Sequence, residues 1–282
     1  MCAGLEDEFG DIIGKARIGQ GYSIEDLSRI TGIKPPDILE LESCRRGPSM
    51  DQVHALAGAL GLDAAKLSGI ANDAWRPEPA PWRAEPNAVV GLVTAPIGSY
   101  SENCYVVGCR ETRRALVVDP GGSVEQVIDV LSELGLSAEA IAITHGHSDH
   151  TAAVASVARR LGIAEIIGSA EGLGSVEGGG LSKRQVADGE GIRLGALTIR
   201  TLDTPGHTRG SVCYLCGFIC FVGDTLFAGS VGRAMGAPDS YRTLLDSVQS
   251  RLLSLPKETA LLPGHGPATS VGEELRHNPF FS

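Results

Sequence analysis

The sequence lacks an apolar run that approaches the ~18 residues needed for a helix to span a bilayer. Its first residues, MCAGLEDEFGD, have neither the basic segment nor the apolar segment of a secretory signal. We therefore expect a soluble, cytoplasmic protein without a membrane partner. Aromatic residues make up only 5% of the chain, so its core should be aliphatic.

Basic residues are also scarce: 24 Lys and Arg stand against 34 Asp and Glu, a net charge of −10. This balance argues against a broad phosphate-binding surface, because nonspecific nucleic-acid binding needs clustered Lys and Arg. The seven cysteines are odd in number and show no framework spacing, which favours reduced thiols. With 43% hydrophobic residues in 282, the chain is long and apolar enough for one large domain or two unequal ones.

A proline-rich segment divides the chain. Four prolines lie between residues 77 and 86, and the two tryptophans of the protein, Trp75 and Trp82, flank or lie within this stretch. Such a composition predicts an extended connector that packs against a domain face. We therefore predict a first domain over residues 1–75, a linker over 76–87 and a second domain over 88–282.

Residues 1–75 have the spacing of short helices. Apolar residues recur at helical intervals, Ser23 is a good N-cap, and Pro35-Pro36 begins a further helix. The stretches SIEDLSRITGI, ILELE, RGPS and LAGALGL resemble the lambda-repressor-like (Cro-type) helix-turn-helix. That resemblance implies a small all-α domain whose third helix enters the DNA major groove.

The charge of this domain is unusual for DNA binding. Residues 1–75 carry seven basic and twelve acidic residues, a net charge of −5, and the expected recognition helix contains Asp37, Glu40 and Glu42. Carboxylates close to phosphates repel them. Two interpretations stay open, DNA binding and a helical module for contact between proteins; we favour a module that joins protomers into a homo-oligomer.

From residue 88 the pattern changes to short β-branched runs with helices between them. This indicates a layered α/β domain. The expected strands are 89–93, 103–107, 115–118, 140–144, 163–167, 197–202, 211–215 and 218–222, and the expected helices are 124–134, 151–161 and 241–253. The segment 168–191, rich in Gly, Ser and Glu, is predicted to be a mobile surface insertion, with a lid or substrate rim as the less favoured alternative.

Histidines gather where predicted strands end. The heptapeptide Thr144-His-Gly-His-Ser-Asp-His150 follows an apolar run, and further histidines stand in Thr-Pro-Gly-His207 and Pro-Gly-His265. Asp224 ends another strand. Imidazole nitrogens and carboxylate oxygens are the ligands that zinc and similar cations prefer, so the set predicts a metal site.

The pattern T-H-x-H-x-D-H followed by His, Asp and His resembles the metallo-β-lactamase superfamily over residues 88–282. The resemblance implies an αβ/βα sandwich with two divalent metal ions, zinc first and iron or manganese as alternatives. One ion would be held by His145, His147 and His207, the other by Asp149, His150 and His265, with Asp224 bridging them. A hydroxide shared by the ions would attack the substrate. Asp149 and Asp224 would handle protons.

Shorter motifs narrow the resemblance to glyoxalase II-like hydrolases of S-acyl-glutathione thioesters. These motifs are DPGG from Asp119, GDTLFAGSVGR up to Arg233, LPGHGP and the C-terminal NPFF. The resemblance implies a small-molecule thioester substrate, with Arg233 either binding a substrate carboxylate or forming a structural salt bridge. Arg233 is followed by Ala-Met-Gly instead of the usual Ser/Thr-Asp, and the chain has no C-terminal extension with glutathione contacts, so thiol carrier and acyl group stay open.

Two other functions compete with this one. Persulfide dioxygenases resemble the same family but use one iron, held at the positions of His145, His207 and Asp224. A metabolite-sensing DNA-binding regulator would also combine these two domains. A secreted β-lactamase is less favoured, because Asp224 stands where such enzymes have a cysteine ligand. Cys213, Cys216 and Cys220 alternate within strands and are expected to be core thiols.

Overall fold

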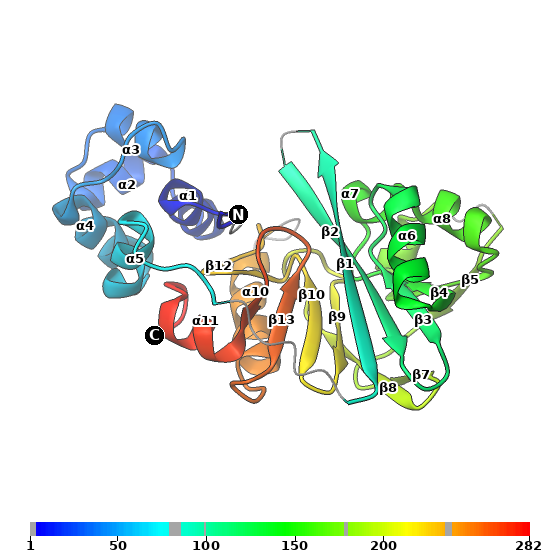
Figure 1. Ribbon diagram of the computed structural model, residues 1–282. Coiled ribbons are helices and arrows are strands. Elements are labelled where there is room, and N and C mark those ends of the chain that lie inside the picture. Colours follow the sequence, from blue (N-terminus) through cyan, green and yellow to red (C-terminus); the bar gives the residue numbers. More distant parts are fainter. Residues whose placement is uncertain (1–3, 79–85, 99, 178–179, 235–238) are drawn as a thin grey trace.

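The structure is a computed structural model that describes residues 4–78, 86–98, 100–177, 180–234 and 239–282. Its elements form an N-terminal group of helices and a two-sheet sandwich (Figure 1). In the described part of the chain, no helix is long and apolar enough to cross a membrane.

The N-terminal helices lie close to the predicted positions. They are α1 (Phe9–Gly19), α2 (Ile24–Thr31), α3 (Pro35–Glu42), α4 (Met50–Leu60) and α5 (Ala64–Ala71). The Ser23 hydroxyl accepts a hydrogen bond from the Asp26 amide at 3.0 Å, and Gly32 ends α2 with a φ of 73°. Capping and the left-handed glycine satisfy backbone groups that the helix itself leaves unpaired. A helix-turn-helix fold stays a prediction for this helical region, residues 4–75.

The first sheet has six strands in the order β1-β2-β3-β4-β5-β6. They are β1 (Ala88–Ile97), β2 (Tyr100–Cys109), β3 (Arg114–Val118), β4 (Ser137–Ala142), β5 (Glu165–Gly168) and β6 (Ser182–Gln185). β1, β2 and β3 pair antiparallel, and β3 to β6 pair parallel. The helices that follow its strands are α6 (Val124–Leu134), α7 (Ser148–Thr151), α8 (Val154–Leu161) and α9 (Ala170–Gly174).

The second sheet has the order β14-β13-β10-β9-β8-β7. Its strands are β7 (Gly191–Leu194), β8 (Leu197–Asp203), β9 (Val212–Cys216), β10 (Ile219–Gly223), β13 (Ala260–Pro263) and β14 (Thr269–Ser270). A hairpin of β11 (Leu226–Phe227) and β12 (Ser230–Val231) leaves the end of β10. Three helical segments complete the fold: α10 (Ser240–Ser247), the π-helical turn η1 (Val248–Leu252) and α11 (Val271–His277).

Three cores establish the layers. One lies between the sheets and includes Leu116 and Tyr214, and a second packs α6 and α8 on the first sheet. The third covers the outer face of the second sheet and unites it with α10, α11 and the N-terminal helices. The fold is therefore the expected αβ/βα sandwich, with the helical region on the side of α10 and α11 (Figure 1).

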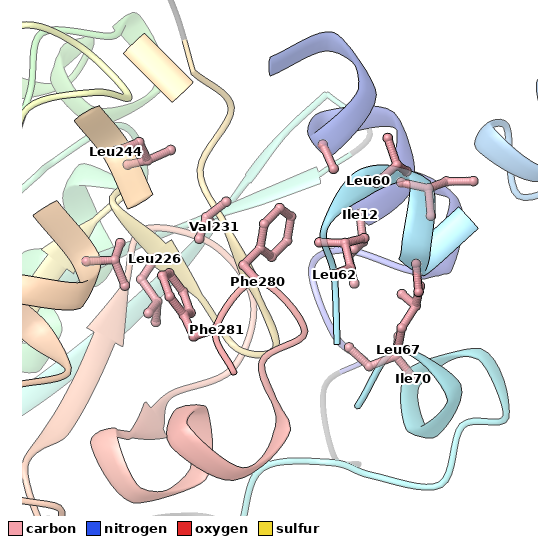
Figure 2. Packing of buried hydrophobic residues seen from close by; sticks show 14 of the residues in the cluster. Ile12, Leu60, Leu62, Leu67, Ile70, Leu226, Val231, Leu244, Phe280 and Phe281 are labelled. Carbon is pink, nitrogen blue, oxygen red and sulfur yellow. The ribbon is translucent and has the colours of Figure 1, made fainter. Parts of the chain in front are cut away.

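The third core is continuous across the junction. Figure 2 shows Phe280 between Val231 of the hairpin and Ile12 and Leu62 of the helical region, with Phe281 on the side of Leu226. The indole of Trp75 stacks on His277 with ring centroids 4.9 Å apart, as expected for a connector residue that packs on a domain face. Trp82 and most of the predicted linker lie outside the described residues. The boundaries at residues 75 and 88 stay a prediction.

Two predictions about local structure were wrong. The segment 168–191 contains the helix α9 and the edge strand β6. The strand forms because Lys183 and its neighbours pair in parallel with β5. The predicted helix 241–253 is an α-helix only to Ser247 and continues as a π-helical turn. The strand was not predicted because its residues are polar, and an edge strand can be polar since it needs little apolar surface.

Candidate metal centre

The candidate ligands stand at strand ends that share one edge of the sandwich. His145 and His147 follow β4, while Asp149 and His150 lie in α7. His207 follows β8, Asp224 follows β10 and His265 follows β13. β10 and β13 are parallel, and β8 runs the same way because both flank the antiparallel β9. Their carboxyl ends therefore meet, and the loop after β4 reaches them from the first sheet.

A first group consists of His145, His147, His207 and Asp224, whose ligand atoms all lie within 4.8 Å of one another. Nδ1 of His147 lies 3.0 Å from Nε2 of His145 and 3.0 Å from Nε2 of His207. Asp224 Oδ2 is 3.6 Å from His207 Nε2. Three imidazole nitrogens and one carboxylate oxygen thus face a common point.

A second group consists of Asp149, His150 and His265, also within 4.8 Å of one another. Nε2 of His265 lies 3.3 Å from Nε2 of His150 and 3.4 Å from Asp149 Oδ2. All seven predicted ligands are therefore brought into these two groups.

Asp224 lies between the two groups. Its Oδ1 is 3.3 Å from His150 Nε2 in the second group, and its Oδ2 is within 3.6 Å of both His207 and His265. Oδ1 is buried and accepts no well-aligned hydrogen bond in the described part of the chain. A carboxylate oxygen in that condition is costly unless a cation balances it. The arrangement suits a ligand that bridges two cations.

The outer nitrogens of three ligands are held by neighbouring groups. Nδ1 of His207 is 2.7 Å from the Arg233 carbonyl oxygen, and Nδ1 of His265 is 2.7 Å from that of Ser101. Nδ1 of His150 lies 3.2 Å from Asp119 Oδ2. An Nδ1–H that donates outward leaves Nε2 as an inward lone pair, which is how proteins orient metal-binding histidines.

Burial and neighbouring charges shift the pKa values of the ligands in different directions. Burial lowers the pKa of His207 to about 4 and that of His145 well below its usual range, so both are neutral at pH 7. Burial opposes the charge of His150 as well, but the Asp224 and Asp119 carboxylates outweigh it and raise its pKa. Burial would raise the pKa of Asp224, yet the surrounding histidines hold it well below its usual range. Neutral imidazoles and ionised carboxylates are the forms that bind metals.

Two glycines allow the backbone to approach the ligands. A Cβ at Gly264 would lie 2.4 Å from His150 Cε1 and 2.5 Å from Asp224 Oδ1. A Cβ at Gly232 would lie 1.7 Å from the Asp224 carbonyl oxygen. Any side chain at these positions would displace a ligand, which explains the glycines within the PGH and VGR motifs.

The sequence analysis missed three residues around the site. Asp119 accepts hydrogen bonds from the Thr144 amide at 2.7 Å and the Thr144 hydroxyl at 2.5 Å, and so anchors the start of the His motif. Glu102 is fully buried with neither carboxyl oxygen hydrogen-bonded in the described chain, and burial raises its pKa to about 9. Tyr100 places its hydroxyl 3.5 Å from Asp149 Oδ2. Only Asp119 had a signal, its place in the DPGG motif.

Arg233 is placed next to the site by its backbone. Its carbonyl oxygen lies 2.7 Å from Nδ1 of His207, and Arg233 as a whole is exposed. Substrate binding by its guanidinium stays a prediction.

The donor set fits metal ions. Five imidazoles and two carboxylates converge with little competing hydrogen bonding, and the donors are the nitrogen and oxygen atoms that zinc, iron and manganese accept. Asp224 belongs to the first group and lies 3.3 Å from His150 of the second.

Comparison with known proteins agrees with this geometry. The profile of the Metallo-beta-lactamase superfamily matches residues 97–265. The chain is 32% identical to hydroxyacylglutathione hydrolase GloC of Haemophilus influenzae over 209 residues, which is 66% of this chain and 96% of that protein. The helical region lies outside the matched segment.

The chain is also similar to two solved structures. ETHE1 from Myxococcus xanthus is 33% identical with a TM-score of 0.57, over 67% of this chain and 83% of that one. TTHA1623 in a di-iron-bound form is 34% identical with a TM-score of 0.55, over 67% of this chain and 100% of that one. The fold of the sandwich is thus shared with these two solved structures.

Proposed function

The chain belongs to the metallo-β-lactamase superfamily, and from this premise we propose that it hydrolyses S-acyl thioesters with the help of two divalent metal ions. The observation that carries the proposal is the position of Asp224 between the two ligand groups: its Oδ1 lies 3.3 Å from His150 Nε2, and its Oδ2 lies 3.6 Å from Nε2 of both His207 and His265. The likeness to a hydroxyacylglutathione hydrolase supports the thioester as substrate.

The metals would be held by His145, His147 and His207 on one side and by Asp149, His150 and His265 on the other, with Asp224 common to both. Bound there, such cations supply hydroxide at neutral pH and polarise a carbonyl group. Zinc is our first choice, with iron and manganese as alternatives.

The chain's own residues orient this chemistry. Asp119 fixes the imidazole of His150, and the Arg233 carbonyl fixes that of His207. Asp149 is half-buried, and burial would raise its pKa, but the hydrogen bond with His265 and the charge of His150 outweigh burial and lower the pKa. We propose that its carboxylate receives a proton during hydrolysis. A thiolate leaves without a proton donor, so no further acid is required for a thioester.

A panel of substrates tests the thioester proposal. We expect the purified protein to release thiol from S-lactoylglutathione or a related S-acyl thioester, and to act much more slowly on a β-lactam and on the matching oxygen ester. Thiol release is followed with a chromogenic disulfide reagent, and the Asp149→Asn variant is the control for metal-site chemistry. Equal rates for ester and thioester would contradict the thioester preference.

Persulfide dioxygenation is the second candidate. Its one iron would use His145, His207 and Asp224, and these three ligands are present in the first group. Oxygen uptake with a glutathione persulfide would favour it. The presence of His265 and Asp149 in a second group is the observation that ranks the hydrolase first.

The partners of the helical region stay predictions. Arg46 pairs with Asp37 at 3.1 Å, and Arg17 donates two hydrogen bonds to Glu42 at 2.6 and 2.8 Å. These pairings leave less positive charge for phosphates, so weak nonspecific DNA binding is expected. Joining of protomers through this region is our proposal for its partner.

A further inference from the structure

The hairpin β11–β12 connects two metal ligands. Its first strand begins two residues after Asp224, and its second strand ends two residues before Arg233, whose carbonyl oxygen lies 2.7 Å from Nδ1 of His207. The backbone of Gly232 passes so close to Asp224 that only a glycine fits there, as described above. A shift of this hairpin would therefore move ligands from both groups.

The hairpin is anchored from α11 on one side. Glu274 accepts a hydrogen bond from the Gly229 amide at 3.0 Å, and Asn278 donates one to the Ser230 carbonyl oxygen at 2.9 Å. These anchors belong to the sandwich. They hold the turn of the hairpin and Ser230, the first residue of β12.

The other anchor comes from the helical region. Lys15 of α1 is only 8% exposed, and its Nζ donates a 2.8 Å hydrogen bond to the Val231 carbonyl oxygen. Asp7, also buried, pairs with the same ammonium group. A buried ammonium is costly unless it is paired and hydrogen-bonded, so this position demands all of its partners.

The same ammonium contacts the second ligand group through an aromatic ring. Lys15 Nζ lies 4.7 Å from the centroid of the Phe227 ring, in the hairpin's first strand. Phe227 in turn meets His265 edge to face, with centroids 5.9 Å apart. Lys15 thus supports both strands of the hairpin, one towards His207 and the other towards His265.

We propose that Lys15 is a positioning residue for the metal centre, and that the helical region completes the metal site from outside the superfamily's matched segment. The ammonium fixes the Val231 carbonyl and the Phe227 ring, and these fix the hairpin that carries Asp224 and the partner of His207. Outer contacts of this kind alter metal affinity by roughly 10–100-fold when they are removed. The inference rests on the proposed metal centre.

The test compares zinc affinity in three variants of the full-length protein. The double variant Lys15→Met with Asp7→Asn removes the ammonium without leaving a buried carboxylate alone. Asp7→Asn by itself keeps the hydrogen bond to Val231. Lys66→Met is the matched control, because Lys66 also crosses from the helical region but donates to the Leu275 and Phe281 carbonyls instead of a hairpin carbonyl.

Zinc is titrated into each metal-free protein in competition with a chromophoric chelator, and thermal stability is measured in parallel. We expect the double variant to lose about tenfold or more in zinc affinity. Lys66→Met should stay within about threefold of the wild type, and Asp7→Asn should fall between the two, because it keeps the hydrogen bond to Val231 but leaves the ammonium without its carboxylate. Zinc affinity that falls equally in the double variant and in Lys66→Met, or in neither, would overturn the proposal.

Two outcomes keep the inference separate from the proposed function. A wild-type protein that binds no zinc, iron or manganese refutes the metal centre and the positioning role with it, whereas a metal-binding wild type with an unaffected double variant refutes only the positioning role. If the double variant does not fold, Phe227→Leu decides. This change removes the ring between Lys15 and His265, and a loss of about fivefold or more in zinc affinity supports the role, while an unchanged affinity refutes it.

Discussion

The first sheet and the helical region both pack against the second sheet, but on opposite faces. Alternate residues of β9 show this, since Tyr214 belongs to the core between the sheets and Cys213 to the core shared with the helices. The first sheet contributes ligands across the junction. The helical region contributes no ligand among its described residues, yet its Lys15 reaches the hairpin between two of them. We call the side of the second sheet that packs on the first sheet, together with the ligands at its strand ends, the chemical face. The opposite side, which packs on the helical region, is the supporting face.

The largest expected effect comes from the chemical face. Asp224→Ala should lower thioester hydrolysis by about 10³-fold or more, because it removes the one carboxylate that faces both ligand groups. Far-ultraviolet circular dichroism should stay close to that of the wild type. Asp246→Ala, on the exposed side of α10, is the matched control and should keep full activity. Retained turnover with full metal content in Asp224→Ala would contradict the bridging role.

Substitutions on the supporting face should lower the free energy of unfolding. Phe280, which is 8% exposed at the junction of the two regions, is expected to cost about 3–5 kcal/mol of unfolding free energy when changed to Ala. Phe218, 47% exposed in the turn between β9 and β10, should cost less than about 0.5 kcal/mol. Urea denaturation measures both. A similar cost for the two variants would mean that the junction is not a packed core.

A buried carboxyl in α11, that of Glu274, predicts a pH dependence. Burial raises the pKa of Glu274 from its ordinary value of 4.5 to about 7. The folded state therefore holds a proton that the unfolded state has released, so stability falls as pH rises from about 4.5 to about 7. The group accounts for roughly 3 kcal/mol of that decline.

Glu274→Gln is the test, because the amide cannot titrate. Urea denaturation at pH 5 and pH 7.5 should show a smaller loss of stability in the variant than in the wild type. Neighbouring Glu273, which adds to the raised pKa, gives the control variant Glu273→Gln, whose pH dependence should change less. An identical slope in wild type and Glu274→Gln would contradict the assignment.

The smallest expected effect concerns Arg233. If its guanidinium holds a substrate carboxylate, Arg233→Ala should raise KM by about tenfold with little change in kcat, as expected for loss of a charge-assisted hydrogen bond. Arg242→Ala, at an exposed position of α10, serves as control. Unchanged kinetics in Arg233→Ala would leave this residue with only its backbone role.

The chemical face was predictable because its signals are local. His145, His147, Asp149 and His150 stand within one heptapeptide, and each remaining ligand closes a strand beside Gly or Pro. A strand end determines where such a side chain points, so the motif and the strands together predicted that the seven ligands would meet.

The supporting face was not predictable in the same way, because its contacts join distant residues. Lys15 and Val231 are 216 positions apart, and Trp75 and Glu273 are 198 apart. A single lysine in an amphipathic helix has the same pattern whether it faces solvent or a buried carbonyl. The orphaned Glu102 gave no signal either, since its environment is created by Asp119 and α7 after folding.

Metal analysis of the purified protein, combined with turnover of an S-acyl thioester by the same sample, tests the central claim most directly. The account predicts two equivalents of divalent metal per chain and thiol release that a chelator abolishes and added metal restores. One equivalent of iron together with oxygen uptake, and without thiol release, would contradict it.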